Sequence, residues 1–278
     1  MVRSTVLKVA TLALSVVLFA GTQSAFANTI IDLKTAGAQS TQAAAIGGTF
    51  IVQQIQPQST GTGFIDSFVR IQQNGFERGY NTDIGTPLDT KGGTFTHSLL
   101  LSDVGTTNIG GTDYYHFVLD INQNGNNLLS LNQIQIFRAP SDMLHSGLIE
   151  ASAGSASLIS FAGATEVFRM NNTGNPNAYE IQLDYSLNAG SGSGDMNLFI
   201  NKALVDAAGG GNNIILYSQF GSPNGAFASN DGFEEWWNLR STPCTNCVPT
   251  VPEPSSLVLL GSGLVGLVVA ARKRARKS

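Results

Sequence analysis

The chain has 278 residues, 42% of them hydrophobic, and 15 lysine and arginine residues against 19 aspartate and glutamate residues give a formal net charge of −4. Much of the basic charge lies at the two ends, so residues 28–251 hold 18 acidic and 8 basic residues, a net charge of −10. An acidic body repels phosphate backbones, and we therefore expect no nucleic-acid partner.

The N-terminus has the parts of a secretory signal peptide. Two basic residues precede an uncharged apolar run, residues 9–20, and Ala25 and Ala27 supply the small side chains that a signal peptidase reads. Residues 1–27 are therefore predicted to engage the secretion machinery and to be removed by signal peptidase after Ala27.

The body, residues 28–242, is predicted to be one β-rich domain. Short runs in which apolar and polar residues alternate are separated by Gly, Asn, Ser and Pro, which is typical of half-buried strands. These runs are residues 29–33, 49–55, 64–71, 94–101, 114–121, 134–137, 157–161, 167–170, 179–187, 213–220 and 233–239. Many short strands with Gly- and Asn-rich turns favour an all-β fold, an antiparallel β-sandwich or jelly roll.

Two segments of the body do not follow this pattern. Residues 35–48 are small, polar and rich in Ala and Gln, which is compatible with a loop or a weak helix. Residues 196–207 are the best candidate for an amphipathic helix in the body.

One segment resembles the start of a calcium-binding loop. Asp120, Asn122 and Asn124, followed by Gly125, match its first six positions and would place oxygen-bearing side chains on one side of a turn. The twelfth position, where a bidentate glutamate is needed, is Leu131. A hairpin loop between two strands needs the same residue types, so a hairpin loop and a Ca²⁺ site both remain possible interpretations of this segment. The protein is not expected to require a cofactor.

Trp236 and Trp237 follow an acidic cluster, residues 231–235. Neighbouring side chains of a strand point to opposite faces, so one ring is expected in the core and the other on the surface. Carbohydrate-binding β-sandwiches stack sugars on exposed aromatic rings, which makes both tryptophans candidate ligand-binding residues. Simple packing at the end of the domain is the alternative.

Cys244 and Cys247 form a single C-x-x-C motif in the Pro-rich stalk, residues 243–254. A zinc site needs two further ligands, and the chain has no second cysteine pair. In an oxidising compartment outside the cytoplasm a local disulfide is expected, with reduced or intermolecular cysteines as the alternatives.

The C-terminus has three parts in a fixed order. Pro252, Glu253 and Pro254 come first, followed by residues 255–271, an uncharged apolar segment of 17 residues. As a helix this segment would cover about 25 Å, which is near the lower limit for a membrane span. Residues 272–278 include five lysines and arginines, which are expected to stay on the cytoplasmic side of the membrane.

This tail resembles the PEP-CTERM sorting domain, also called the ice-binding protein C-terminal domain. The resemblance implies that exosortase, a membrane-embedded cysteine protease or transpeptidase of Gram-negative bacteria, recognises Pro252, Glu253 and Pro254 and processes the chain. It also implies an intermediate anchored in the inner membrane and a final place in the cell envelope or extracellular matrix. Phrases of the body, such as residues 119–122 and 231–236, resemble exported PEP-CTERM proteins of uncharacterised function and imply no activity.

The expected function is that of a non-enzymatic surface module that binds extracellular polysaccharide. His97, His116 and His145 lie in no metal-binding or nucleophile motif. A secreted polysaccharide hydrolase is the second hypothesis, which two carboxylates meeting in a cleft would favour. A purely structural or adhesive role is the third.

Overall fold

The computed structural model describes residues 29–55, 65–149, 157–171, 179–190, 192–221, 226–230 and 232–239. In these ranges short strands form two seven-stranded sheets and two two-stranded ribbons. The pairing is antiparallel throughout both sheets except for one parallel pair at an edge. The all-β sandwich expected from the alternating pattern is confirmed.

The first sheet is built around a long central strand. In spatial order it contains β1 (Thr29–Asp32), β14 (Tyr179–Asp184), β10 (Leu128–Ala139), β16 (Asn213–Phe220) and β6 (Glu77–Tyr80), with β13 (Thr165–Arg169) beside β10 and β7 (Leu99–Leu100) beside β16. The register of β10 with β13 shifts between Ile136 and Phe137. Strand β1 runs parallel to β14 and forms the edge.

The second sheet packs against the first. In spatial order it contains β2 (Gln39–Ala43), β3 (Thr49–Gln54), β15 (Met196–Asn201), β9 (Thr112–Asp120), β18 (Glu234–Leu239) and β4 (Ile65–Ile71), with β8 (Thr106–Ile109) beside β9. The ribbons are β11 (Gly147–Ile149) with β12 (Leu158–Ser160), and β5 (Asn74–Gly75) with β17 (Ser229–Asn230). The helices are η1 (Leu101–Asp103), η2 (Tyr185–Leu187) and α1 (Lys202–Ala207).

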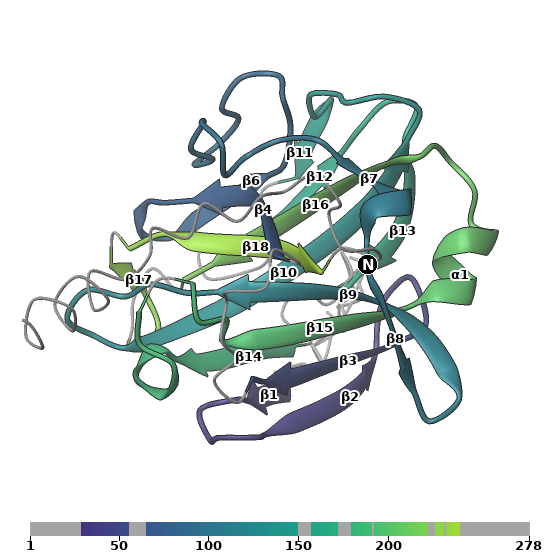
Figure 1. Cartoon of the computed structure of the whole chain (residues 1–278). Coiled ribbons are helices and arrows are strands. Elements are labelled where there is room, and N and C mark those ends of the chain that lie inside the picture. Colours follow the sequence, from purple (N-terminus) through teal and green to yellow (C-terminus); the bar gives the residue numbers. More distant parts are fainter. Residues whose placement is uncertain are drawn as a thin grey trace, which may run out of the picture.

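The core lies between the two sheets. Buried apolar side chains of both sheets form one cluster, in which Phe68 and Leu119 come from the second sheet and Leu131 and Leu216 from the first. Figure 1 shows the layered strands, with α1 at one end of the sandwich and β17 at the other. Burial of these side chains is the main favourable term for such a fold.

The two sides of the sandwich differ. On one side β4 and β6 are linked through residues 89–91, where Lys91 N donates to Arg70 O of β4 (2.8 Å) and Asp89 N donates to Arg78 O of β6 (2.9 Å). On the other side β1 and β2 are the last strands of their sheets, and residues 33–38 connect them directly (Figure 1). The first side is therefore closed, and the second has two sheet edges.

The two irregular segments of the body fold differently from the sequence pattern. Residues 35–48 are neither loop nor helix throughout, because they contain β2, which pairs along its whole length with β3. Pairing with a formed strand overrides the weak local preference. In residues 196–207 the first half is strand β15, whose Met196, Leu198 and Ile200 are buried with a period of two, and only the second half is helix α1.

Helix α1 has six residues, and the side chain of Asn201 caps it by accepting a hydrogen bond from Leu204 N at 3.1 Å. No helix within the described ranges is long and apolar enough to cross a membrane. The predicted span, residues 255–271, lies outside these ranges.

Candidate functional site

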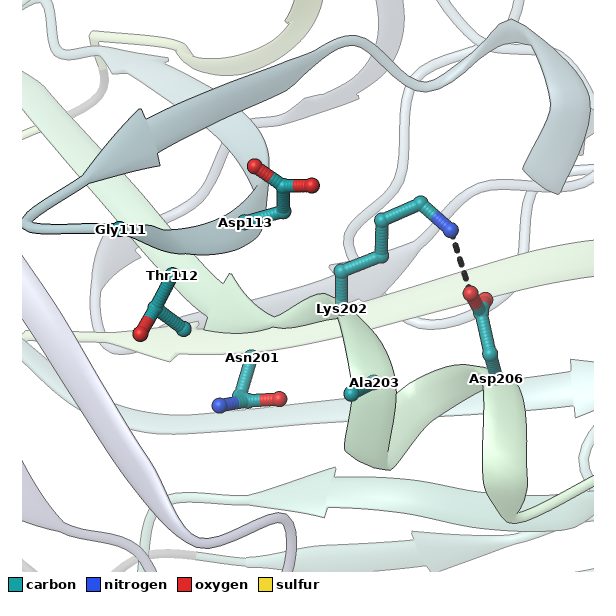
Figure 2. Close-up of a pocket in the computed structure, with 7 residues that line it drawn as sticks. All are labelled: Gly111, Thr112, Asp113, Asn201, Lys202, Ala203 and Asp206. Carbon is teal, nitrogen blue, oxygen red and sulfur yellow. Dashed lines mark hydrogen bonds and ion pairs between the residues drawn. The ribbon is translucent and has the colours of Figure 1, made fainter.

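An open pocket of about 380 Å³ lies between the start of β9 and helix α1 (Figure 2). Gly111, Thr112 and Asp113 line one wall, and the residues Asn201, Lys202, Ala203 and Asp206 line the other. The walls meet because β9 pairs with β15, which sets Asn201 opposite Tyr114 just before α1 begins.

The charged groups of the pocket are paired with one another. Lys202 and Asp206, one helical turn apart, form an ion pair (Figure 2), and Tyr115 Oη donates to Asp206 Oδ1 at 2.7 Å. Burial acts to raise the pKa of Asp206, but the bonds from Lys202 and Tyr115 outweigh it and hold that pKa below its usual value. The hydrogen bond to Asp206 raises the pKa of Lys202. Near neutral pH the wall is therefore an ionised pair that can bind polar groups.

The candidate calcium loop is not a hairpin. Asp120 ends β9 in the second sheet, and β10, which follows at Leu128, belongs to the first sheet. Residues 121–127 therefore cross between the sheets, which excludes the hairpin interpretation. Gly125 has a φ of +94°, the left-handed conformation that a sharp reversal needs.

Each of the three candidate ligands forms a hydrogen bond with a different residue. Asp120 Oδ2 accepts from Gly192 N at 2.6 Å, whereas Asn122 Nδ2 donates to Phe233 O at 3.4 Å. Asn124 donates its backbone N–H to Asn230 Oδ1 at 2.6 Å. In the part of the chain that the structure describes, no group of three or more His, Cys, Asp or Glu side chains is arranged to hold a metal ion.

Both tryptophans of β18 are buried. Trp236 is 0% exposed in the core, and its Nε1–H donates to Ser218 Oγ of β16 at 2.9 Å, a bond between the two sheets. Trp237 is 5% exposed and packs with Ile55 and Val118 in a small separate cluster. The two rings do lie in different clusters, but the expected exposed ring is absent. Neither ring offers a flat platform for a sugar.

Three acidic residues lie side by side on adjacent strands at the end of the second sheet. The β9–β15 register places Asp195, which precedes β15, opposite Asp120, and the β9–β18 register places Glu235 opposite Asp120 on the other side. Asp195 Oδ2 accepts from Ile121 N at 2.8 Å. Burial raises the pKa of Asp120 to about 7 and that of Asp195 to about 8.

Arg70 compensates one of these charges. Its Nε lies 2.6 Å from Glu235 Oε1, and its guanidinium carbon lies 3.8 Å from the ring centre of Phe95 and 4.3 Å from that of Phe233. The Arg70 side chain is about one-quarter exposed and that of Glu235 is 4% exposed. Burial and neighbouring carboxylates favour the neutral forms of Asp120 and Asp195, whereas the positive charge of Arg70 opposes this at Asp120.

A second carboxyl pair joins the two sheets. Glu77 of β6 and Glu234 of β18 are both fully buried and lie close enough to change each other's pKa. Glu234 Oε1 accepts from Gln123 Nε2 at 2.9 Å. Burial raises the pKa of both groups, and the negative charge of Glu77 raises that of Glu234 further. These pairs lie inside the sandwich, where they act on stability.

Comparison with known families finds a motif beyond the described residues. Residues 250–275 match the PEP-CTERM protein-sorting motif. The chain carries a PEP-CTERM sorting motif. The matched residues include Pro252, Glu253 and Pro254 and most of the apolar and basic tail, as the resemblance implied. The motif identifies exosortase as the processing partner and marks an exported, envelope-directed protein.

Searches of curated proteins and of solved structures returned no match. The residues expected to act in processing and cross-linking lie outside the described ranges; they are Ala25, Ala27, Cys244, Cys247, Pro252, Glu253 and Pro254. The pocket residues Asp113, Lys202 and Asp206 were not predicted from the sequence. Only the i,i+4 spacing of Lys202 and Asp206 signals their ion pair.

Proposed function

We propose that this exosortase-sorted protein uses its β-sandwich as a non-enzymatic binding module at the cell surface or in the extracellular matrix, with glycan as its ligand. The observation that carries the proposal is the open polar pocket between β9 and α1. The sorting motif supports the location, and the pocket supports the binding.

The pocket has the chemistry that hydroxyl-rich ligands need. Thr112 and Asn201 can both donate and accept hydrogen bonds, Lys202 donates, and Asp113 and Asp206 accept. Its volume of about 380 Å³ lies within the usual range of small-ligand sites. None of the lining residues is aromatic, so a sugar would be held by hydrogen bonds without stacking.

The acid–base properties of the carboxyl groups support a binding role over hydrolysis. Glycoside hydrolysis needs an accessible protonated carboxylic acid beside a second carboxylate. Asp206 in the pocket is held ionised by Lys202 and Tyr115. Asp120 and Asp195, whose pKa values are raised, are at most 3% exposed and out of a substrate's reach.

The test is a glycan array with an insoluble-polysaccharide pull-down, using the full chain in mild detergent. We expect Asp113→Ala to weaken binding at least about tenfold, the effect of losing roughly one charge-assisted hydrogen bond. Asp103→Ala, which removes an exposed acidic side chain of η1 outside the pocket, should bind as the parent does.

Two results would overturn the proposal. If the parent chain binds no glycan, a structural or adhesive role is favoured instead. Release of reducing sugar from a bound polysaccharide, abolished by Asp113→Ala, would identify a hydrolase instead.

A further inference from the structure

We propose that the free edge of strand β2 pairs with β2 of a second copy of this chain, antiparallel and centred on Thr41, so that two sandwiches join as a symmetric dimer. This interaction surface is independent of the pocket beside α1, which lies at the end of the sandwich (Figure 1).

The hydrogen bonds at both ends of β2 show which backbone groups face outward. Ala38 O accepts from Gln54 N, and Ala44 N donates to Gly48 O, both at 2.8 Å, so the even-numbered residues face β3. In an antiparallel pair the intervening residues point their N–H and C=O groups the other way. Gln39, Thr41 and Ala43 therefore direct theirs toward the open edge, where the described parts of the chain supply no partner.

This edge lacks the features that usually block pairing. Monomeric proteins protect sheet edges with charged side chains, proline, bulges or a covering segment. Strand β2 reads Gln-Ser-Thr-Gln-Ala, with no charge and no proline, and its register with β3 is continuous. The side chains of Gln39, Thr41 and Ala43 are exposed. An uncharged edge with a regular register is a template for another strand.

A second copy fits this edge because β2 is complementary to itself. With Thr41 on the twofold axis, Gln39 lies opposite Ala43 of the partner subunit, and every outward N–H and C=O group of the strand finds a partner, about six hydrogen bonds in all. No like charges meet across the pair. Ile30 of β1, 55% exposed on the other edge strand of the same side, adds apolar surface beside the contact. An isologous contact of this kind closes as a dimer.

The register is tested by cross-linking in a Cys244→Ser, Cys247→Ser background of the full chain. Directly opposite residues of a hydrogen-bonded antiparallel pair have Cα atoms about 5.5 Å apart, within the range of a disulfide. Thr41→Cys should therefore form a covalent dimer under mild oxidation. The matched control Ala43→Cys should not, because the two Ala43 positions are four residues apart along the strand, roughly 13 Å.

Association itself is tested by sedimentation of the full chain in mild detergent. The parent and Thr41→Ser should be dimers. Thr41→Pro removes one outward N–H and no bond to β3, and should be monomeric. Thr41→Lys places two like charges in contact and should also be monomeric, with an unchanged tryptophan emission spectrum as the check on folding.

A monomeric parent chain at the highest concentration tested would overturn the proposal. So would dimers that persist in both Thr41→Pro and Thr41→Lys, which would place the contact elsewhere. Equal cross-linking of Thr41→Cys and Ala43→Cys would refute the register.

Discussion

The buried acids Asp120 and Asp195 should make the protein less stable as the pH rises. Their pKa values in the folded chain are about 7 and about 8, against 3.8 for an unperturbed aspartate. Between these values the folded chain keeps protons that the unfolded chain has lost. The stabilisation is complete below about pH 4, falls steadily above it, and is gone once the pH has risen past the folded pKa values of about 7 and about 8.

The expected magnitude is large. Each retained proton contributes about 1.4 kcal/mol per pH unit to the slope of the free energy of unfolding. From pH 5 to pH 7 the two groups together account for about 5 kcal/mol, compared with a total of about 5–15 kcal/mol for a typical domain. Asp195→Asn keeps an oxygen that can accept from Ile121 N and carries no titrating proton. It should reduce the slope by about 1.4 kcal/mol per pH unit.

The assay is urea unfolding at pH 5, 6, 7 and 8, followed by the fluorescence of Trp236 and Trp237, which are buried when folded. Burial lowers the pKa of His116 below its unfolded value of 6.5. As the pH falls below 6.5 the unfolded chain therefore gains a proton first, and His116 lowers the free energy of unfolding, whereas Asp120 and Asp195 raise it. The contribution of His116 is common to parent and variant and cancels in their difference. The exposed Asp113→Asn is the matched control. Equal slopes for the parent and Asp195→Asn would refute the reasoning.

Three further changes test separate parts of the structure. Arg70→Ala should lower the free energy of unfolding by about 3 kcal/mol in urea, because it leaves Glu235 buried and unpaired; a loss below about 1 kcal/mol would contradict this. Gly232→Ala should reduce soluble yield and stability by more than about 3 kcal/mol, because its Cβ would overlap Asn122 O. Calcium and chelator should leave the melting temperature unchanged, since Asp120 bonds to the backbone; a rise with calcium would restore the cation site.

The strands were predictable wherever side chains alternate between core and solvent. Residues 213–220 coincide with β16, and residues 29–33 contain β1. Strand β2 was missed because its side chains are all small or polar, and only pairing with β3 makes it a strand. The partition of residues 196–207 into strand and helix was missed because both patterns share the apolar residues at the junction.

The site was less predictable, because contacts between distant residues define it. Asp120 and Asp195 are 75 positions apart, and only the register of β9 and β15 makes them neighbours. The loop chemistry of Asp120 to Gly125 correctly indicated a reversal, but which sheet the chain enters next depends on the core. The tail was predictable because its order of motif, apolar segment and basic cluster is a linear signal.

The central claim is that exosortase processes this exported chain at its PEP-CTERM motif. The most direct test is the intact mass of the protein recovered from one bacterial host with and without its exosortase. Processing predicts a chain without residues 272–278 when exosortase is present and a chain that retains them when it is absent. Recovery of the same chain, with residues 272–278 intact, both with and without exosortase would contradict the account.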